Sequence, residues 1–149
     1  MKNFKFSLER MRSYKNQLLD REKDALARCR AREREIEAQM RALSGELQQK
    51  SHELAERQRQ GMDSGELMVY RLYLENGRRS GEQLRQALEA ARQASEAQLQ
   101  VVVAASQEVT SLDKLEDRQR EEYRLEEGKE REKILSEFVS SQVIRSRSV

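Results

Sequence analysis

Apolar residues along most of this chain recur at alternating steps of three and four, with charged residues between them. The clearest series runs from Leu26 to Leu54, and a second runs from Leu84 to Leu115. This spacing places apolar side chains in one stripe along a helix, as in the heptad seam of a coiled coil. The predicted seam comprises Phe4, Leu8, Met11, Leu18, Leu26, Cys29, Ile36, Met40, Leu43, Leu47, Leu54, Leu84, Leu88, Leu99, Val102, Val109, Leu112, Leu115, Ile134 and Phe138.

One short segment clearly interrupts the helical pattern. Gly61 suits the C-terminal end of a helix, and Asp63 stands three residues before Glu66, as in a capping box. Further along, Gly77 and Gly81 weaken a helix by about 1 kcal/mol each relative to alanine. These breaks predict two helices with a kink or a short separate helix between them.

The predicted fold class is therefore all-α: a long antiparallel two-helix coiled coil with a kinked or short-helix tip around residues 61–80. We expect a single coiled-coil domain over residues 1–149. Its expected parts are a first helix at about 3–60, a turn at 61–65, a tip helix at about 64–77, a second helix at about 80–144 and a frayed tail at 145–149.

Two registers are open to helices joined in this way. A tight hairpin would leave Ile134 and Phe138 beyond the N-terminal end of the chain. A wider tip would instead pair Phe4 with Phe138. The same register would place Lys15 beside Glu126. We expect the wider register, because it covers the apolar ends and gives Lys15 a carboxylate, and we expect a monomeric hairpin.

Composition supports the helical interpretation and narrows the function. None of the 149 residues is proline, the residue that most strongly interrupts helices. Charged residues make up 38% of the chain and hydrophobic residues 36%, enough for a narrow seam between helices. Because positive and negative residues are interspersed and the net charge is only +2, solvated helix faces are favoured over a nucleic-acid-binding surface.

No arrangement of residues suggests catalysis. His52 and Cys29 are the only histidine and cysteine, whereas a structural zinc site needs four ligands. There is no glycine-rich phosphate loop, and a two-helix rod offers no cavity for a reacting group. We therefore expect no enzyme activity, catalytic residue, cofactor or metal. The absence of a long apolar run and the single cysteine predict a cytoplasmic chain that reaches a membrane only through a partner.

The tip carries more apolar surface than one seam can cover. Leu67, Tyr70 and Leu74 share one stripe. Val69, Leu72 and Tyr73 fall outside it. Either these extra residues pack a short third helix onto the rod, or they form an exposed aromatic anchor for a partner. The charge-dense ends of the chain are likewise either solvated faces or a spindle that enters an oppositely patterned ring.

Three motifs, in order along nearly the whole chain, resemble those of the flagellar FliJ proteins. They are Phe4-Lys5-Phe6-x-Leu8-Glu9 with Met11 and Tyr14 behind it, Gly61-Met62-x-x-x-Glu66-Leu67-x-x-Tyr70-x-x-Tyr73-Leu74, and Lys114-Leu115-x-x-Arg118-Gln119 leading to Glu137-Phe138. Coiled coils share each motif by composition, but the order and spacing of all three make the match specific.

The resemblance implies a stalk-like antiparallel coiled coil, similar to the central stalk of rotary ATPases, in the flagellar type III export apparatus. It implies that the terminal helix regions enter the ring of the export ATPase FliI and that the middle region contacts the export gate protein FlhA. Some members bind export chaperones. The gate-contacting residues would be Leu67, Tyr70, Tyr73 and Leu74. Phe4, Phe6 and Leu8 would be seam residues that close the terminal end. The implied location is the cytoplasmic side of the cell membrane at the flagellar base. A self-associating structural coiled coil and the stalk of an injectisome remain the alternatives.

Overall fold

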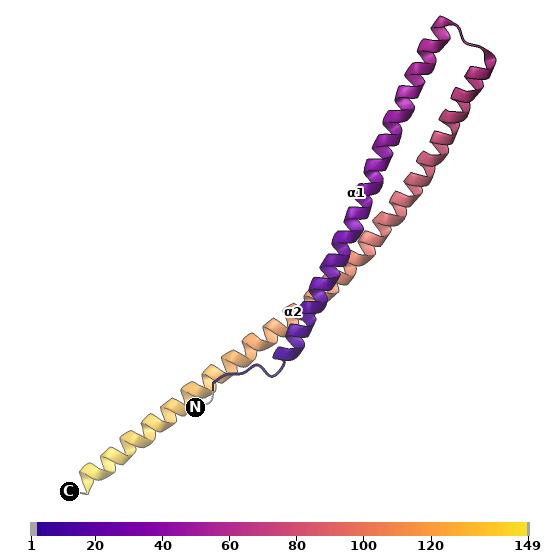
Figure 1. Ribbon diagram of the computed structural model, residues 1–149. Coiled ribbons are helices and arrows are strands. Elements are labelled where there is room, and N and C mark those ends of the chain that lie inside the picture. The colour runs from indigo at the N-terminus through magenta and orange to yellow at the C-terminus, as the bar shows by residue number, and fades with distance from the viewer. Residues whose placement is uncertain (1–2, 149) are drawn as a thin grey trace. The chain divides into compact units, whose positions relative to one another are not determined.

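The computed structural model describes residues 3–148 and contains two long helices, α1 (Glu9–Gln60) and α2 (Ser64–Arg147) (Figure 1). The described residues include no strand. The helices pack against each other as the arms of a hairpin. The predicted all-α two-helix fold is therefore confirmed.

A turn of three residues joins the helices. Gly61 adopts a φ of +98°, a left-handed conformation that suits glycine at the end of a helix. The Asp63 carboxylate then accepts a hydrogen bond of 2.8 Å from the backbone N–H of Glu66, which satisfies one free donor at the start of α2. The capping residues expected from the sequence thus set both helix ends.

The structure corrects three of the expected helix boundaries. The first helix begins at Glu9 and not at residue 3, because the backbone before it is extended and turns into the helix only at residues 7–8. No separate tip helix exists, since α2 runs without a break from Ser64 to Arg147. The helix also continues through residues 145–147, where we expected fraying, and Val149 lies outside the described residues.

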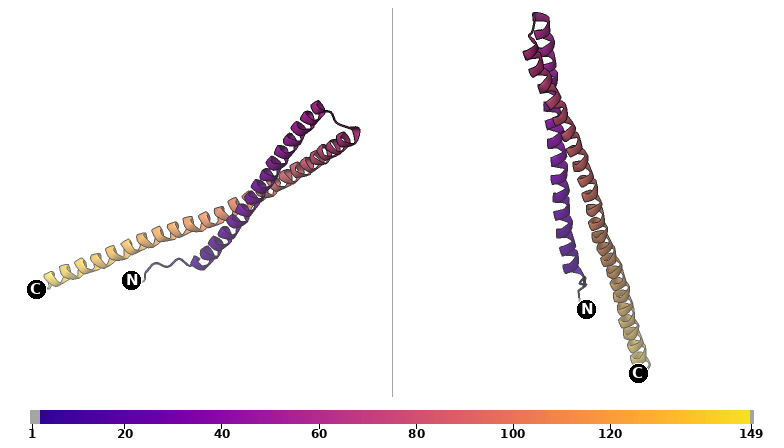
Figure 2. Two further views of the ribbon diagram at one scale, coloured as in Figure 1. Left: turned by 45° about the horizontal axis from the view of Figure 1, so that its top comes forward. Right: turned by 90° about the vertical axis from the view of Figure 1, so that its right-hand side faces the viewer.

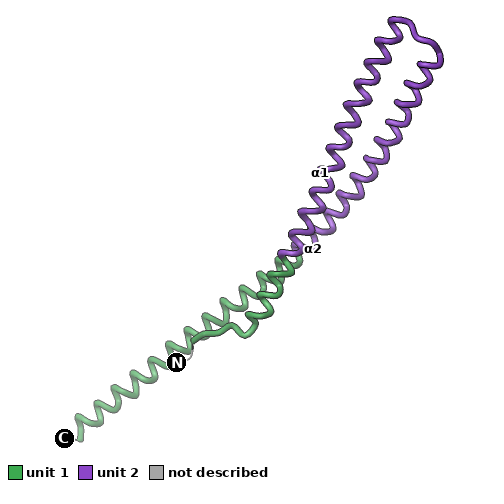
Figure 3. The backbone as a smooth tube through the Cα atoms, viewed as in Figure 1, with its two compact units in different colours: residues 1–19, 104–149 green, residues 20–103 purple. Residues whose placement is uncertain are grey.

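The chain divides into two compact units, shown in Figure 3: residues 20–103, and residues 1–19 with 104–149. We call them the hairpin-tip unit and the terminal unit. Each contains a segment of both helices. A single coiled-coil domain over the whole chain stays a prediction.

In the hairpin-tip unit, contacts between the helices define a tight antiparallel register. The Gln98 amide donates to the backbone carbonyl of Glu22 at 3.0 Å, and the Lys50 ammonium lies 5.7 Å from the centre of the Tyr73 ring. Ile36, only 2% exposed, is the most buried large side chain. Leu26, Leu88 and Ser95 complete the buried core of this unit.

The terminal unit has a similarly tight register. Lys15 pairs with Glu108 at 2.8 Å, and not with Glu126. The wider register that we expected is therefore wrong. Its physical reason is the turn, because a helix that restarts three residues after Gln60 leaves no wide tip to shift the pairing. Phe6, Leu19 and Val109 form the buried core here.

This register decides where the predicted seam residues lie. All of them are buried or half-buried except Met11, Ile134 and Phe138. Ile134 and Phe138 are each 59% exposed because α2 continues past the beginning of α1. Both views in Figure 2 show this end of α2 without a neighbouring segment of α1. Phe6, expected to close the terminal end, is buried, and Leu19 is a core residue that the seam prediction omitted.

Candidate partner-binding surfaces

An exposed apolar face lies at the beginning of α2. Met68, Val69, Leu72 and Tyr73 recur at steps of one, three and one, which places them on one side of the helix. All four are exposed, from 41% for Tyr73 to 67% for Val69. We call this group the tip surface.

The opposite face of the same helix turns toward α1. Leu67, Tyr70 and Leu74 are half-buried there, in a helical row that continues to Gly77, which lies against Leu47. Of the residues predicted to contact the gate, only Tyr73 is therefore exposed. The structure does not form a short third helix from these residues, since all of them belong to α2.

The Tyr73 ring lies beside a cation. The Lys50 ammonium lies 5.7 Å from the ring centre, within the range of a cation–π interaction. Lys50 also donates to Glu53 at 3.2 Å, and this hydrogen bond raises the pKa of Lys50 above its usual value. Lys50 therefore remains charged at neutral pH and holds the ring at the edge of the tip surface.

The terminal unit is closed by an aromatic and ionic cluster. The Phe4 ring lies 5.7 Å from the Tyr123 ring at an angle of 55°, and the Arg120 guanidinium lies 4.8 Å from the Phe4 ring centre. Nearby, the Arg12 guanidinium lies 5.4 Å from the ring of buried Phe6. These contacts attach the extended N-terminal segment to α2. We call this group the N-terminal cluster.

Arg12 is the electrostatic centre of this cluster. It forms ion pairs with Glu9 and Glu116, and its distance to the Asp113 carboxylate is 3.6 Å. The hydrogen bond from Arg12 lowers the pKa of Glu116, and Arg120 adds to the effect at 3.1 Å. The sequence indicated Phe4 and Phe6 as residues that close this end of the seam, but it gave no signal for Arg12.

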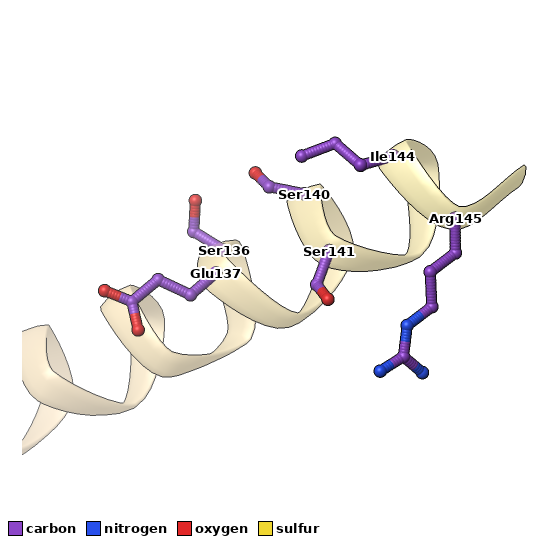
Figure 4. A pocket seen from close by; sticks show the side chains of 6 residues that line it. All are labelled: Ser136, Glu137, Ser140, Ser141, Ile144 and Arg145. Atoms are coloured by element: carbon purple, nitrogen blue, oxygen red, sulfur yellow. The ribbon is translucent and has the colours of Figure 1, made fainter. Parts of the chain in front are cut away.

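A second exposed apolar face lies near the C-terminal end of α2. Every described side chain from residue 128 onward is exposed, and we call residues 128–147 the α2 extension. Its apolar stripe consists of Ile134, Leu135, Phe138, Val139 and Val143. The more polar side of the extension forms a shallow, open depression (Figure 4) whose lining side chains all come from this one helix. A small ligand would not be enclosed there.

The described residues hold no feature of a metal or membrane-spanning site. Within residues 3–148, no three histidine, cysteine or acidic side chains are placed to bind a metal ion. Over the same residues, neither helix combines the length and the apolar character that crossing a bilayer requires. His52 is exposed and Cys29 is half-buried. The arrangement therefore favours binding through surfaces.

Comparison with known families identifies the chain. The family model described as Flagellar FliJ protein matches residues 4–148. The chain belongs to the FliJ family. Family membership makes it a component of the flagellar protein export apparatus and confirms the resemblance seen in the three motifs. FliJ proteins are structural or export components and are not known as enzymes. No curated protein and no solved structure matches the chain.

Proposed function

We propose that this FliJ chain is a non-enzymatic stalk that links the ring of the export ATPase FliI to the export gate protein FlhA. The observation that supports a linking role is that each compact unit carries its own exposed apolar face. The tip surface belongs to the hairpin-tip unit, and the α2 extension belongs to the terminal unit. A linker needs two separate binding surfaces, whereas a protein with one partner needs only one.

The terminal unit is the part that we assign to the ATPase ring. Its α2 extension presents an apolar stripe between charged residues of both signs, including an Arg131–Glu127 pair at 2.9 Å. The walls of a ring can cover such a stripe from several sides. Charges of mixed sign on both partners can guide its entry, because electrostatic complementarity acts mainly on encounter and orientation.

The tip surface is the part that we assign to FlhA. Its residue types suit a binding anchor, since an aromatic ring contributes strongly at interface centres and methionine adapts to irregular surfaces. The exposed members Met68, Val69 and Leu72 join Tyr73 in this assignment. Leu67, Tyr70 and Leu74, which we first expected to touch the gate, would support the surface from the side facing α1.

Two further parts of this proposal rest on the family alone. Export chaperones are additional partners, and the working location is the cytoplasmic side of the membrane at the flagellar base. No particular side chain of this chain is assigned to either.

The experiment that tests the proposal uses the purified full chain and purified FliI. We expect the chain to bind FliI, promote assembly of its ring and raise ATP turnover. A Phe138→Glu change should weaken these effects, because it places a charge in the apolar stripe. Ser140→Glu, on the polar side of the same helix, is the matched control and should behave as wild type. Absence of binding, together with unchanged ring assembly and turnover, would refute the ring assignment.

A further inference from the structure

The α2 extension is a helix whose apolar stripe has no cover within the described chain. An amphipathic helix gains most of its stability by packing its apolar face, and serine and glycine contribute little helix propensity of their own. The extension contains Gly128 and several serines, among them Ser136, Ser140 and Ser141. Packing the stripe against a partner would therefore stabilise this helix.

The observed register removes the cover that the sequence suggested. In the wider register, the beginning of the chain would have packed on Ile134 and Phe138. In the structure, Phe4 instead contacts Tyr123 and Arg120, well before Ile134. The stripe continues along the same helix beyond these contacts.

We propose that the α2 extensions of two copies of this chain pair in an antiparallel, two-fold symmetric contact through this stripe. In a two-fold contact, if residue i of one copy contacts residue j of the other, then residue j of the first copy contacts residue i of the second. Such a pairing can be centred on Ser136. Ile134 of each copy then lies opposite Phe138 of the other. The contact between these two large apolar side chains therefore occurs twice in the dimer.

The charges of the extension fit the same centre. Glu127 and Arg145 are also equidistant from Ser136, so each copy brings Glu127 opposite the other copy's Arg145. The two residues lie in line with Ile134 and Phe138 along the helix, because Glu127 is seven residues before Ile134 and Arg145 is seven residues after Phe138. In a two-fold antiparallel pair, one such ion pair therefore lies at each end of the contact. Within one chain Glu127 also pairs with Arg131 at 2.9 Å, so its carboxylate is shared between the two cations.

The pairing is expected to be weak. The contact spans only a few helical turns, whereas stable specific interfaces bury at least about 1,000 Å² in total. A weak dimer is compatible with the proposed function, since the stripe is also the surface assigned to FliI. Paired and ring-bound forms would then exclude each other. The inference does not rest on that function, because oligomeric state is measured without FliI.

The test is the mass of the full chain by analytical ultracentrifugation from about 5 to about 500 µM, a range suited to a contact of this size. Wild type should rise from the monomer mass of 17.5 kDa toward twice that value. Phe138→Glu should remain monomeric with unchanged far-ultraviolet helicity at low concentration. Ser140→Glu, with the same added charge on the opposite side of the helix, should dimerise within about twofold of wild type.

Charge reversal tests the antiparallel register itself. Arg145→Glu and Glu127→Arg should each weaken dimerisation by about fivefold, because each places like charges opposite each other in both symmetric positions. The double substitution should restore it, since the pairs are reformed with the signs exchanged. A mixture of the two single variants should dimerise more strongly than either variant alone.

Several results would overturn the proposal. A wild-type chain that stays monomeric throughout the range excludes self-pairing. A dimer that persists in Phe138→Glu uses another surface, and a double reversal that fails to restore pairing excludes the register. A monomer that instead co-sediments with phosphatidylglycerol vesicles, and loses this with Phe138→Glu, assigns the stripe to a lipid surface. A monomer that binds FliI through Phe138 assigns it to the ring alone.

Discussion

Gly77 of α2 lies against Leu47 of α1 with no space for a side chain between them. A methyl group at Gly77 would lie 3.1 Å from the Cγ atom of Leu47 and closer still to its Cδ2 atom. Glycine costs about 1 kcal/mol relative to alanine inside a helix. The close approach of the two helices at this point offsets that cost through packing against Leu47.

Gly77→Ala should therefore destabilise the hairpin although alanine is the better helix former. Overpacking typically costs about 1–3 kcal/mol, and we expect a net loss of about 1 kcal/mol after the gain in propensity. Thermal unfolding followed by circular dichroism measures the change.

Gly81 and Gly128 provide the matched controls for Gly77. A methyl group at Gly81 would make an ordinary contact of 3.7 Å with Leu43, and one at Gly128 would meet nothing within 4 Å. Alanine at either position should raise stability by up to about 1 kcal/mol. If Gly77→Ala also raises stability, the helices are not in close contact at Leu47.

The register can be tested by truncating two isoleucines that the sequence treats alike. Ile36 is 2% exposed, whereas Ile134 is 59% exposed. Ile36→Ala should destabilise by about 2–4 kcal/mol through lost burial and the cavity that remains. Ile134→Ala should change stability by less than about 0.5 kcal/mol in dilute solution. Urea unfolding measures both, and equal losses would instead support the wider register.

The helical periodicity was sufficient to predict the fold class, the turn and most of the seam. Steps of three and four identify the buried stripe regardless of its partner, and Gly61 with Asp63 marks the turn through local capping. Those features depend on neighbouring residues only. They could be predicted because little outside the segment changes them.

The register and the binding surfaces depend on distant pairings, so periodicity alone left them undetermined. Every heptad shift pairs apolar with apolar residues, so covering Phe138 favours a wider register than the short turn allows. The sequence also does not predict the close approach at Gly77. A glycine in a helix indicates only a lower helix propensity until Leu47 is known to lie opposite it.

The Arg12–Glu116 pair makes the terminal unit sensitive to acid. The pKa of Glu116 is lowered in the folded state, chiefly by its hydrogen bond from Arg12. A lowered pKa contributes stability above the unfolded value of about 4.3, and that contribution is lost as the pH falls through the folded value. Helicity of the terminal unit should therefore decrease below about pH 4.

Glu116→Gln isolates this pair from other carboxylates. The variant should be less stable than wild type at pH 7, and the difference should shrink as the pH falls to about 3. Glu121→Gln, on the exposed surface of the same helix, serves as the control. Urea midpoints at several pH values provide the measurement. A gap between wild type and Glu116→Gln that stays constant with pH would contradict the assignment.

We expect gate binding and hairpin stability to depend on different side chains at the tip. Leu72, 61% exposed, should matter for binding, and Leu72→Glu should weaken binding to FlhA by at least about tenfold, as expected for charging an interface centre. Tyr73→Ala should also weaken it. Val103→Glu makes a similar change at an exposed position elsewhere on α2 and should leave binding unchanged. Titration of immobilised FlhA measures each affinity.

Tyr70 should behave in the opposite way, because it is half-buried on the side of α2 that faces α1. Tyr70→Ala should lower the unfolding midpoint, whereas Leu72→Glu should not. Once folded, the Tyr70→Ala hairpin keeps the exposed side chains of the tip surface, so its affinity for FlhA should fall by less than that of Leu72→Glu. The reverse order of affinities would place the gate contact on the row of Leu67, Tyr70 and Leu74, and would require the two helices to separate at the tip before FlhA binds.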